Sequence, residues 1–256
     1  MKSRVLVPEL MDDPSIDPKE HRRALLGLRR VNAICQTGQQ LANEILKIAR
    51  ERKRDSLSVL DLGCGSGDIA TDVGRRLAGK VQCDITGWDI SPTAIGYAHE
   101  FWSAQQEQPR YALPSSIQVK FRQVDVFEPT PEKFDIVYCC LFLHHFSESQ
   151  AVQLLQRMKG LASISVLVDD LQRTRLGWGL AAMGVHLLSR SPVVHFDGPQ
   201  SVRAAFSVKE AIAIAAQAGM KPSTVRKHWP ERFLLRWDAT PMNHIARNNM
   251  YDSEPA

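Results

Sequence analysis

An apolar stretch that runs directly into a glycine-rich turn constrains the fold of this chain more than any other feature of its 256 residues. The stretch covers residues 59–62 and is apolar except for Asp61, and the turn carries Gly63, Gly65 and Gly67 before Asp68. Glycine adopts positive φ angles without strain and lets a backbone come close to a ligand, where a Cβ atom would collide. The pattern predicts a buried strand, a ligand-binding turn and a helix, in that order.

Short apolar runs alternate with helical segments from Asp55 onward, which is typical of βαβ units and a mostly parallel sheet. Five such runs are expected to be strands: Leu57–Leu62, Asp84–Trp88, Ile117–Gln123, Phe134–Cys139 and Ile164–Val168. Two further runs, Ser223–His228 and Phe233–Arg236, predict an antiparallel hairpin at one sheet edge. The expected fold class is therefore α/β, with a doubly wound, mostly parallel seven-stranded sheet that ends in a C-terminal antiparallel hairpin.

The N-terminal part of the chain precedes this alternating region. Residues 1–18 contain three prolines and predict an irregular arm. Residues 19–54 have a helical pattern, which we expect to break near Gly38. Such an N-terminal helical extension could simply pack on the sheet, or it could close over a ligand. We expect the second, with residues 1–54 covering a cofactor or a substrate.

After the fifth strand the alternation stops. No formally charged residue lies between Arg175 and Arg190, and this stretch is long enough for a buried or interfacial helix but too short to cross a membrane. We therefore expect a catalytic domain over residues 55–256, with residues 170–206 inserted as a helical lid. Inside the domain, Ser147 with Gln150 and Ser207 with Glu210 predict capping boxes at two helix starts.

Charge and cysteine content exclude several classes of protein. The net charge of +4 comes from 32 basic and 28 acidic residues without a basic block, which does not favour nucleic acid as a partner. No signal sequence or membrane span is evident, so we expect a soluble cytoplasmic protein with reduced thiols. The cysteines show neither zinc-site nor disulfide-scaffold spacing: Cys35, Cys64, Cys83, Cys139 and Cys140.

The glycine spacing indicates which ligand the turn would bind. Dinucleotide enzymes use G-x-G-x-x-G, with a pyrophosphate at the helix N-terminus. Here the third glycine comes one position early, and Asp68 at the helix start would repel a diphosphate. The amino and sulfonium groups of S-adenosylmethionine (SAM) are cationic, so Asp68 and Asp61 favour SAM over a nicotinamide cofactor.

These residues resemble motif I of class I SAM-dependent methyltransferases, and the resemblance covers roughly residues 55–170. It implies that the glycine turn contacts the methionine part of SAM, that Asp89 binds the ribose hydroxyls, and that Ile90 lies against adenine. It further implies that Asp125 and the amide of Val126 bind the adenine base. The cofactor-binding residues expected on this basis are Asp61, Gly63, Cys64, Gly65, Gly67, Asp89, Ile90, Asp125, Val126, Cys140 and Leu141. For Asp89 and Asp125, the alternative is a helix N-cap.

Methyl transfer from a sulfonium is an in-line displacement, so alignment of the acceptor matters most. A base is needed only for a protonated acceptor, and His145 and His144 after the fourth strand are the candidates; the alternative is that they cap or pack. The resemblance implies SAM as cofactor, S-adenosylhomocysteine as product and no metal. Because no proline precedes Cys140, this residue is expected to be a structural thiol and not a nucleophile.

The insertion is where this family builds its acceptor site, and its apolar content favours an apolar or aromatic small molecule. The candidate acceptor-binding residues are Trp178, Met183, His195 and Arg203. Alternatively, the helix merely packs and Arg203 only pairs with Asp197. The whole chain resembles the ubiquinone and menaquinone biosynthesis type of methyltransferase, and less closely bacterial enzymes that modify polyketides or phenolic lipids, which favours O-methylation. Competing hypotheses are a methyltransferase acting on RNA or protein and a non-catalytic SAM-binding protein.

Overall fold

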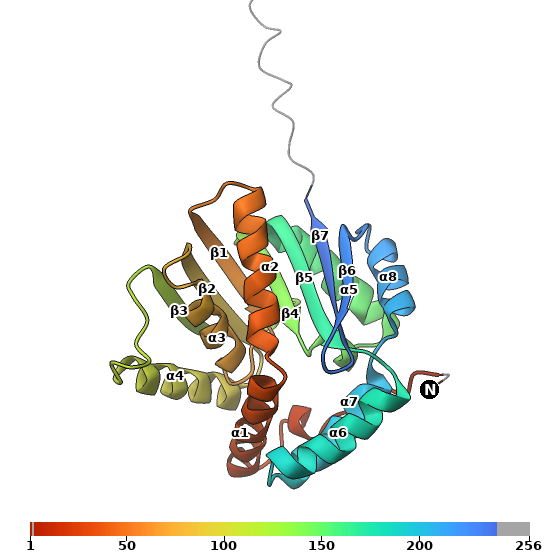
Figure 1. The fold of residues 1–256 in the computed structure, drawn as a ribbon. Coiled ribbons are helices and arrows are strands. Elements are labelled where there is room, and N and C mark those ends of the chain that lie inside the picture. Colours follow the sequence, from red (N-terminus) through yellow and green to blue (C-terminus); the bar gives the residue numbers. More distant parts are fainter. Residues whose placement is uncertain (2, 240–256) are drawn as a thin grey trace, which may run out of the picture.

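A seven-stranded sheet organises the computed structural model, which describes residue 1 and residues 3–239 (Figure 1). The strand order is β3-β2-β1-β4-β5-β7-β6, in which the first five strands are parallel and β7 is antiparallel to both of its neighbours. The strands are β1 (Ser56–Leu62), β2 (Gln82–Asp89), β3 (Ile117–Gln123), β4 (Phe134–Cys140), β5 (Ala162–Leu171), β6 (Thr224–His228) and β7 (Arg232–Asp238). The predicted sheet and its C-terminal hairpin are confirmed.

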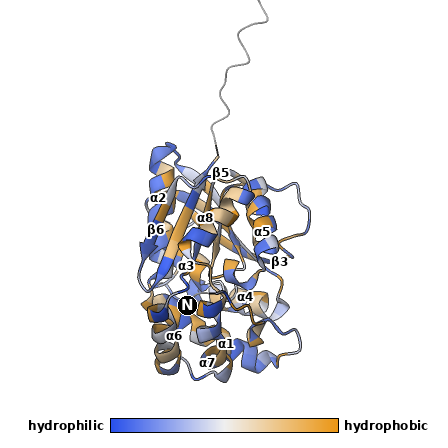
Figure 2. Ribbon diagram, turned by 90° about the vertical axis from the view of Figure 1, so that its right-hand side faces the viewer, coloured by the Kyte–Doolittle hydropathy of each residue, from blue (hydrophilic) through white to orange (hydrophobic). Residues whose placement is uncertain are grey.

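Helices cover both faces of this sheet, as expected for a doubly wound fold. Apolar side chains of α2, α3 and α4 pack on one face, and those of α5 and α8 pack on the other. The helices are α1 (Pro18–Ile34), α2 (Thr37–Glu51), α3 (Asp68–Leu77), α4 (Pro92–Gln106), α5 (Glu148–Leu161), α6 (Arg175–Leu188), α7 (Pro192–Ala204) and α8 (Val208–Gln217). Figure 2 shows that hydrophobic residues concentrate between these layers, whereas the edge strand β6 is largely hydrophilic.

The register of the parallel strands brings their carboxyl ends to one edge of the sheet. Leu62 at the end of β1 pairs with Trp88 of β2 and with Cys139 of β4. The glycine turn follows β1 at this edge, and the short 3-10 helix η2 (Leu143–His145) follows β4. Helices α1, α6 and α7 gather at the same edge, together with the 3-10 helix η1 (Leu10–Asp12) of the N-terminal arm (Figure 1).

The N-terminal helical segment breaks at Cys35 and Gln36, slightly before the predicted position near Gly38. Gln36 has a left-handed backbone (φ 52°) and separates α1 from α2. Gly38 instead lies in the first turn of α2, where a Cβ atom would come within 2.4 Å of the Asp72 carboxylate on α3. The glycine therefore permits close packing of α2 on α3 and does not end a helix.

The insertion after β5 contains two helices, where the uncharged stretch predicted only one. Strand β5 continues to Leu171. Helices α6 and α7 then pack against each other and against α1 (Figure 1). The second helix contains Gly198 and Pro199, residues that normally interrupt helices. A Cβ atom at position 198 would lie 2.5 Å from the Val185 side chain, so this glycine lets α7 approach α6.

Within the described residues, no helix is both long and apolar enough to cross a membrane. The predicted catalytic domain extends to residue 256, and its last part, residues 240–256, lies outside the described residues.

Candidate active site

The glycine turn between β1 and α3 has the backbone that its sequence predicts. Gly63, Gly65 and Gly67 all have positive φ angles, of 73°, 50° and 69°. The amides of Gly63 and Cys64 donate to the Trp88 carbonyl, which holds the turn against the end of β2. A Cβ atom at Gly65 would meet only Leu25, at 3.9 Å, so the turn leaves space on that side.

Three carboxyl groups surround the turn without a paired cation. Burial, with smaller contributions from the nearby Asp68 and Asp89, raises the pKa of Asp61 to about 8 against the lowering effect of Tyr138. Burial also raises the pKa of Asp68 and of Asp89. Among the described residues, no lysine, arginine or histidine forms an ion pair with any of the three. A cationic ligand would therefore be stabilised at this turn.

Asp89 holds the turn and also ends β2. One of its carboxylate oxygens accepts from the Gly65 amide at 2.8 Å, and the other accepts from the Ser91 amide at 2.9 Å. The N-cap of α4 is Ser91, whose hydroxyl accepts from the Ala94 amide. The alternative role of Asp89 as a helix N-cap is therefore not what the structure shows.

The remaining residues expected at the cofactor also lie at the carboxyl ends of strands. Asp125 accepts from the Phe127 amide in the turn after β3, and Val126 beside it is buried. Ile90 is 64% exposed after β2, free to contact a flat ligand. Cys140 is the last residue of β4, and the next residue, Leu141, has a φ of 54° and donates its amide to the Asp169 carbonyl.

Cys140 is a buried structural thiol in this arrangement. Its Sγ atom accepts from the Arg232 guanidinium at 3.0 Å, and that guanidinium also contacts the buried Asp169. Burial raises the pKa of the Cys140 thiol well above its usual range, so the thiol stays protonated and is a poor nucleophile.

Helix α1 lies over the open side of the glycine turn. Leu25 faces Gly65, and the Asn32 amide donates to the Asp68 carboxylate at 3.1 Å. His21 is buried on the same helix, close enough to Asp89 for that carboxylate to raise its pKa against the larger lowering by burial. The N-terminal helix thus contributes side chains to the region around the turn.

Both predicted histidines lie at this edge, and carboxylates contact both nitrogens of each ring. His144 is buried, with Nδ1 2.7 Å from Asp170 and Nε2 3.3 Å from Glu9. His145 has Nδ1 2.6 Å from Asp12 and Nε2 3.9 Å from Glu9. Burial lowers the pKa of His144, but Asp170 and Glu9 together raise it to about 10. Neither ring presents a free nitrogen to the crevice.

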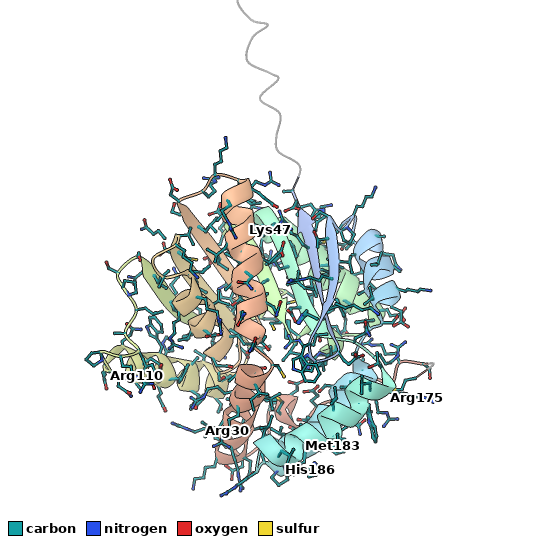
Figure 3. The ribbon with its side chains drawn as sticks, in the orientation of Figure 1. Arg30, Lys47, Arg110, Arg175, Met183 and His186 are labelled. Atoms are coloured by element: carbon teal, nitrogen blue, oxygen red, sulfur yellow. The ribbon has the colours of Figure 1, made fainter. Side chains whose placement is uncertain are left out.

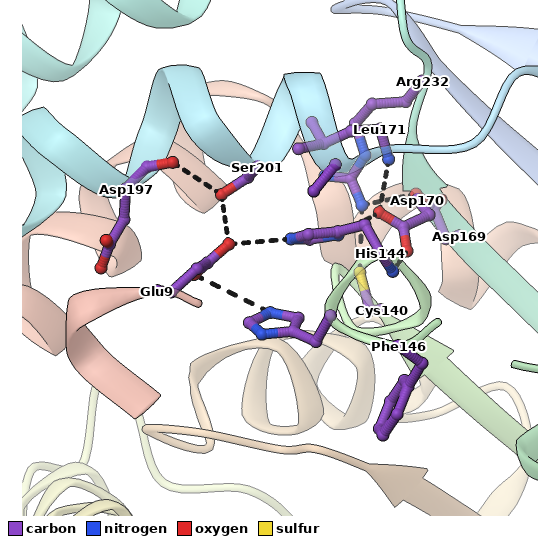
Figure 4. Close-up of polar contacts among 12 residues, drawn as sticks. Glu9, Cys140, His144, Phe146, Asp169, Asp170, Leu171, Asp197, Ser201 and Arg232 are labelled. Atoms are coloured by element: carbon purple, nitrogen blue, oxygen red, sulfur yellow. Dashed lines mark hydrogen bonds and ion pairs between the residues drawn. The ribbon is translucent and has the colours of Figure 1, made fainter. Parts of the chain in front are cut away.

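The N-terminal arm passes between these histidines and α7 (Figure 4). Glu9 is buried there and contacts Ser201 as well as both imidazoles. Burial raises the pKa of Glu9, but the two histidines and Ser201 lower it to about 2. Glu9, Asp12 and Asp170 were not predicted as site residues. Of these three residues, only Asp170 could have been predicted from the sequence, because it lies near the end of the predicted fifth strand.

The predicted acceptor residues are only partly brought together. Trp178 and Arg203 line a cavity of about 390 Å³ with Arg175. Met183 is 64% exposed on α6, near His186 (Figure 3). The ring of His195 stacks on that of His186 with centroids 4.2 Å apart.

The alternative pairing of Arg203 with Asp197 is wrong. Arg203 donates to the Gln200 side chain, whereas the Asp197 carboxylate accepts from the amides of Leu10 and Met11. Both residues lie on α7, six positions apart, and at 3.6 residues per turn they therefore point to different sides of that helix. Asp197 thus fixes the N-terminal arm and leaves Arg203 at the cavity.

Comparison with known proteins agrees with this geometry. Residues 59–163 match the model of a family described as "Methyltransferase domain". The chain is 25% identical over 182 residues to a ubiquinone biosynthesis O-methyltransferase of Pseudomonas entomophila, a match that covers 67% of this chain and 71% of that protein. Curated relatives of the same name from other bacteria are 26–30% identical, and the matches span 35–56% of their length.

Solved structures share the fold. Magnesium protoporphyrin IX methyltransferase from Synechocystis with bound S-adenosylhomocysteine superposes with a TM-score of 0.56 and 18% identity, covering 82% of this chain and 87% of that one. A SAM-dependent methyltransferase from Aquifex aeolicus gives a TM-score of 0.60 and 15% identity, covering 88% and 100%. The family match, the curated relatives and the fold agree, and together they support a SAM-dependent methyltransferase of class I.

Proposed function

We propose that this methyltransferase transfers the methyl group of SAM to the oxygen of a small apolar or aromatic acceptor, a phenolic, polyketide-like or quinone-like metabolite. The observation that carries the proposal is the group of carboxylates around the glycine turn, Asp61, Asp68 and Asp89, which have raised pKa values and no cationic partner among the described residues. SAM supplies two positive charges to such a site.

The residues present fit SAM. Asp61 lies buried under the turn and would face the ammonium group, since a buried carboxylate is stabilised by an opposite charge. The space beside Gly65 admits the methionine part. Asp89 keeps lone pairs for the ribose hydroxyls after its two backbone bonds, because a carboxylate accepts about four hydrogen bonds.

The adenine would lie beyond Asp89, between two adjacent strand ends. Ile90 offers an exposed apolar side chain to one face of the base. Asp125 and the Val126 amide follow the neighbouring strand β3, where the exocyclic amine and a ring nitrogen could be bound. Cys140 and Leu141 would close the site from the end of β4.

Alignment of the acceptor would supply most of the rate enhancement. A positioned nucleophile in an in-line displacement can gain about 7 to 11 kcal/mol. A base role for His145 requires Glu9 to leave its Nε2 atom, and the buried His144 would serve to position the segment after β4. The SAM sulfonium supplies the electrophile, and the surrounding helices exclude water.

The acceptor would enter from the side of the insertion. Trp178 and Arg203 at the cavity suit an aromatic compound that carries an acidic group. Met183 and His195 lie along the same pair of helices and would extend this surface. The ubiquinone biosynthesis O-methyltransferases among the relatives support an acceptor of the phenolic or quinone class.

Residues 1–54 would cover the bound cofactor. Leu25 and Asn32 of α1 contact the glycine turn and Asp68, and Glu9 of the arm contacts the segment after β4. Residues 55–256 would form the methyltransferase domain proper, with α6 and α7 as its lid.

Calorimetric titration with SAM tests the cofactor site. Asp89→Ala should weaken binding by about 1.5 to 3 kcal/mol, since hydrogen bonds to a charged acceptor are lost. Asp84→Ala is the matched control, because Asp84 lies exposed on the same strand β2. Full SAM affinity in Asp89→Ala, or no SAM binding by the unaltered protein, would contradict the proposal.

The reaction is tested by mass spectrometry of phenolic and quinol extracts incubated with the protein and SAM. A product heavier by one methylene group is expected. Comparison with a catechol library in which each hydroxyl is blocked in turn would identify the atom that is methylated. Products formed only from RNA or protein would overturn the small-molecule assignment.

A further inference from the structure

The side chains of Glu9, His144 and His145 converge between the N-terminal arm and η2, and Figure 4 shows Glu9 beside His144. One ligand atom from each residue lies within 4.8 Å of the other two. Glu9 is 8% exposed and His144 is 3% exposed, so two of the three groups are shielded from water. These atoms are held by segments more than 130 residues apart, which the fold brings together.

The spacing between Glu9 and His144 matches that of two ligands on one metal ion. Ligands of a tetrahedral zinc ion, with bonds of ~2.0–2.1 Å, lie about 3.3–3.4 Å apart. The Oε1 atom of Glu9 lies 3.3 Å from Nε2 of His144, and its Oε2 atom lies 3.9 Å from Nε2 of His145. Both separations exceed the ~2.7–3.2 Å usual for an N–H···O bond.

A second ring of carboxylates orients both imidazoles toward the shared point. Nδ1 of His144 lies 2.7 Å from Asp170, and Nδ1 of His145 lies 2.6 Å from Asp12. When a metal ion displaces the Nε2 proton to solvent, Nδ1–H still donates to its carboxylate and the lone pair of Nε2 faces inward. Histidines that bind metals almost always make this second interaction, which fixes the ring and strengthens the ligand.

We propose that Glu9, His144 and His145 bind one divalent transition-metal ion of the Zn²⁺ type, with Asp170 and Asp12 orienting the two imidazoles. Two imidazoles and one carboxylate select zinc, cobalt, nickel or iron over magnesium and calcium, which prefer oxygen ligands. Three protein ligands leave one tetrahedral position for water. The ion ties the N-terminal arm to the segment after β4, and with the ion bound His145 would have no free nitrogen to act as a base in methyl transfer.

The test uses the full chain, dialysed against a chelator and titrated with Zn²⁺ in a calorimeter without SAM. One Zn²⁺ per chain is expected, and Co²⁺ in its place should give the visible absorption of a tetrahedral nitrogen and oxygen site. Glu9→Gln and His144→Ala should each weaken binding at least about 10-fold. Because SAM is absent, failure of the methyltransferase assay leaves this measurement unaffected.

Two further variants keep the result interpretable. Asp12→Asn changes a half-exposed residue that contacts only the ring of His145, so the protein should fold and bind zinc about 10- to 100-fold more weakly. His186→Ala is the matched control, since His186 also stacks on a second histidine but has no carboxylate partner in the described structure. No zinc binding, unchanged binding in Glu9→Gln, or an equal loss in His186→Ala would overturn the proposal.

Discussion

Asp61 is a buried carboxyl group whose ionisation couples stability to pH. Burial raises its pKa in the folded chain to about 8, whereas an unfolded chain has a value of about 3.9. Between these values the folded state binds a proton that the unfolded state has released. Stability from this group is therefore complete below about pH 4 and is lost as the pH rises toward 8, by at most about 1.4 kcal/mol per pH unit.

Asp61→Asn removes this dependence. Urea unfolding without SAM should give a free energy of unfolding that falls less steeply between pH 5 and 8 in the variant than in the unaltered protein. The same variant should bind SAM more weakly, because an amide cannot balance the ammonium charge. Parallel pH profiles for the two proteins would show that Asp61 is ionised throughout this range in the folded protein and would contradict the prediction.

Alanine substitutions at Gly67 and at Gly79 allow the cost of backbone strain to be distinguished from the cost of a steric collision. Both have φ angles near 70°, so alanine at either position costs about 1 to 2 kcal/mol of strain. At Gly67 the new Cβ atom would also lie 2.4 Å from the buried ring of Phe121, whereas at Gly79 nothing lies within 4 Å. Gly67→Ala should therefore lower the urea midpoint clearly more than Gly79→Ala, and equal midpoints would contradict the collision.

At the level of whole elements, the contact between α6 and α7 depends on Gly198. Gly198→Ala should destabilise the protein by about 1 to 3 kcal/mol, because its Cβ atom would overlap the Val185 side chain. Val185→Ala in the same chain should restore part of the loss. Gly184→Ala on α6 is the control: nothing lies within 4 Å, and helix propensity predicts a gain of roughly 0.5 to 1 kcal/mol. Thermal unfolding measures all three variants, and equal shifts for the two glycine positions would refute the packing argument.

The same pair of helices shows which elements the sequence can predict. The capping boxes at Ser147 and Ser207 form as predicted, because their bonds join residues only three positions apart. The gathering of the acids at the strand ends was also predictable, because the carboxyl ends of parallel strands lie at the same edge of a sheet. Helix α7 was missed because Gly198 and Pro199 disfavour a helix locally, and only contact with α6 overrides them.

The site after β4 was beyond prediction for a related reason. His144 and His145 could be found from their position behind a strand, but their partner Glu9 lies about 135 residues away along the chain. No periodicity or spacing links two segments so far apart. Their contact depends on the path of the N-terminal arm, which α7 fixes through Asp197 and Ser201.

For the molecule as a whole, the decisive contact is between this arm and the sheet edge, and Arg4 is its main anchor. The guanidinium donates to the carbonyls of Ala204, His144 and Phe146, and it lies 3.7 Å from the centre of the Phe206 ring. It therefore joins the arm to η2, α7 and the start of α8 at once. Loss of these bonds should release the arm while the sheet stays intact.

Arg4→Ala should raise amide hydrogen exchange in the arm, most clearly at Val5, whose amide donates to the Arg203 carbonyl. Amides in β1 and β4 should exchange as before, since local opening leaves the central strands protected. Arg110→Ala, an exposed arginine that contacts only Tyr111, is the control and should change neither region. If the arm covers the crevice, SAM should slow exchange at Val5 in the unaltered protein and less so in Arg4→Ala. Protection by SAM that is equal in both proteins would mean that the arm does not respond to the cofactor.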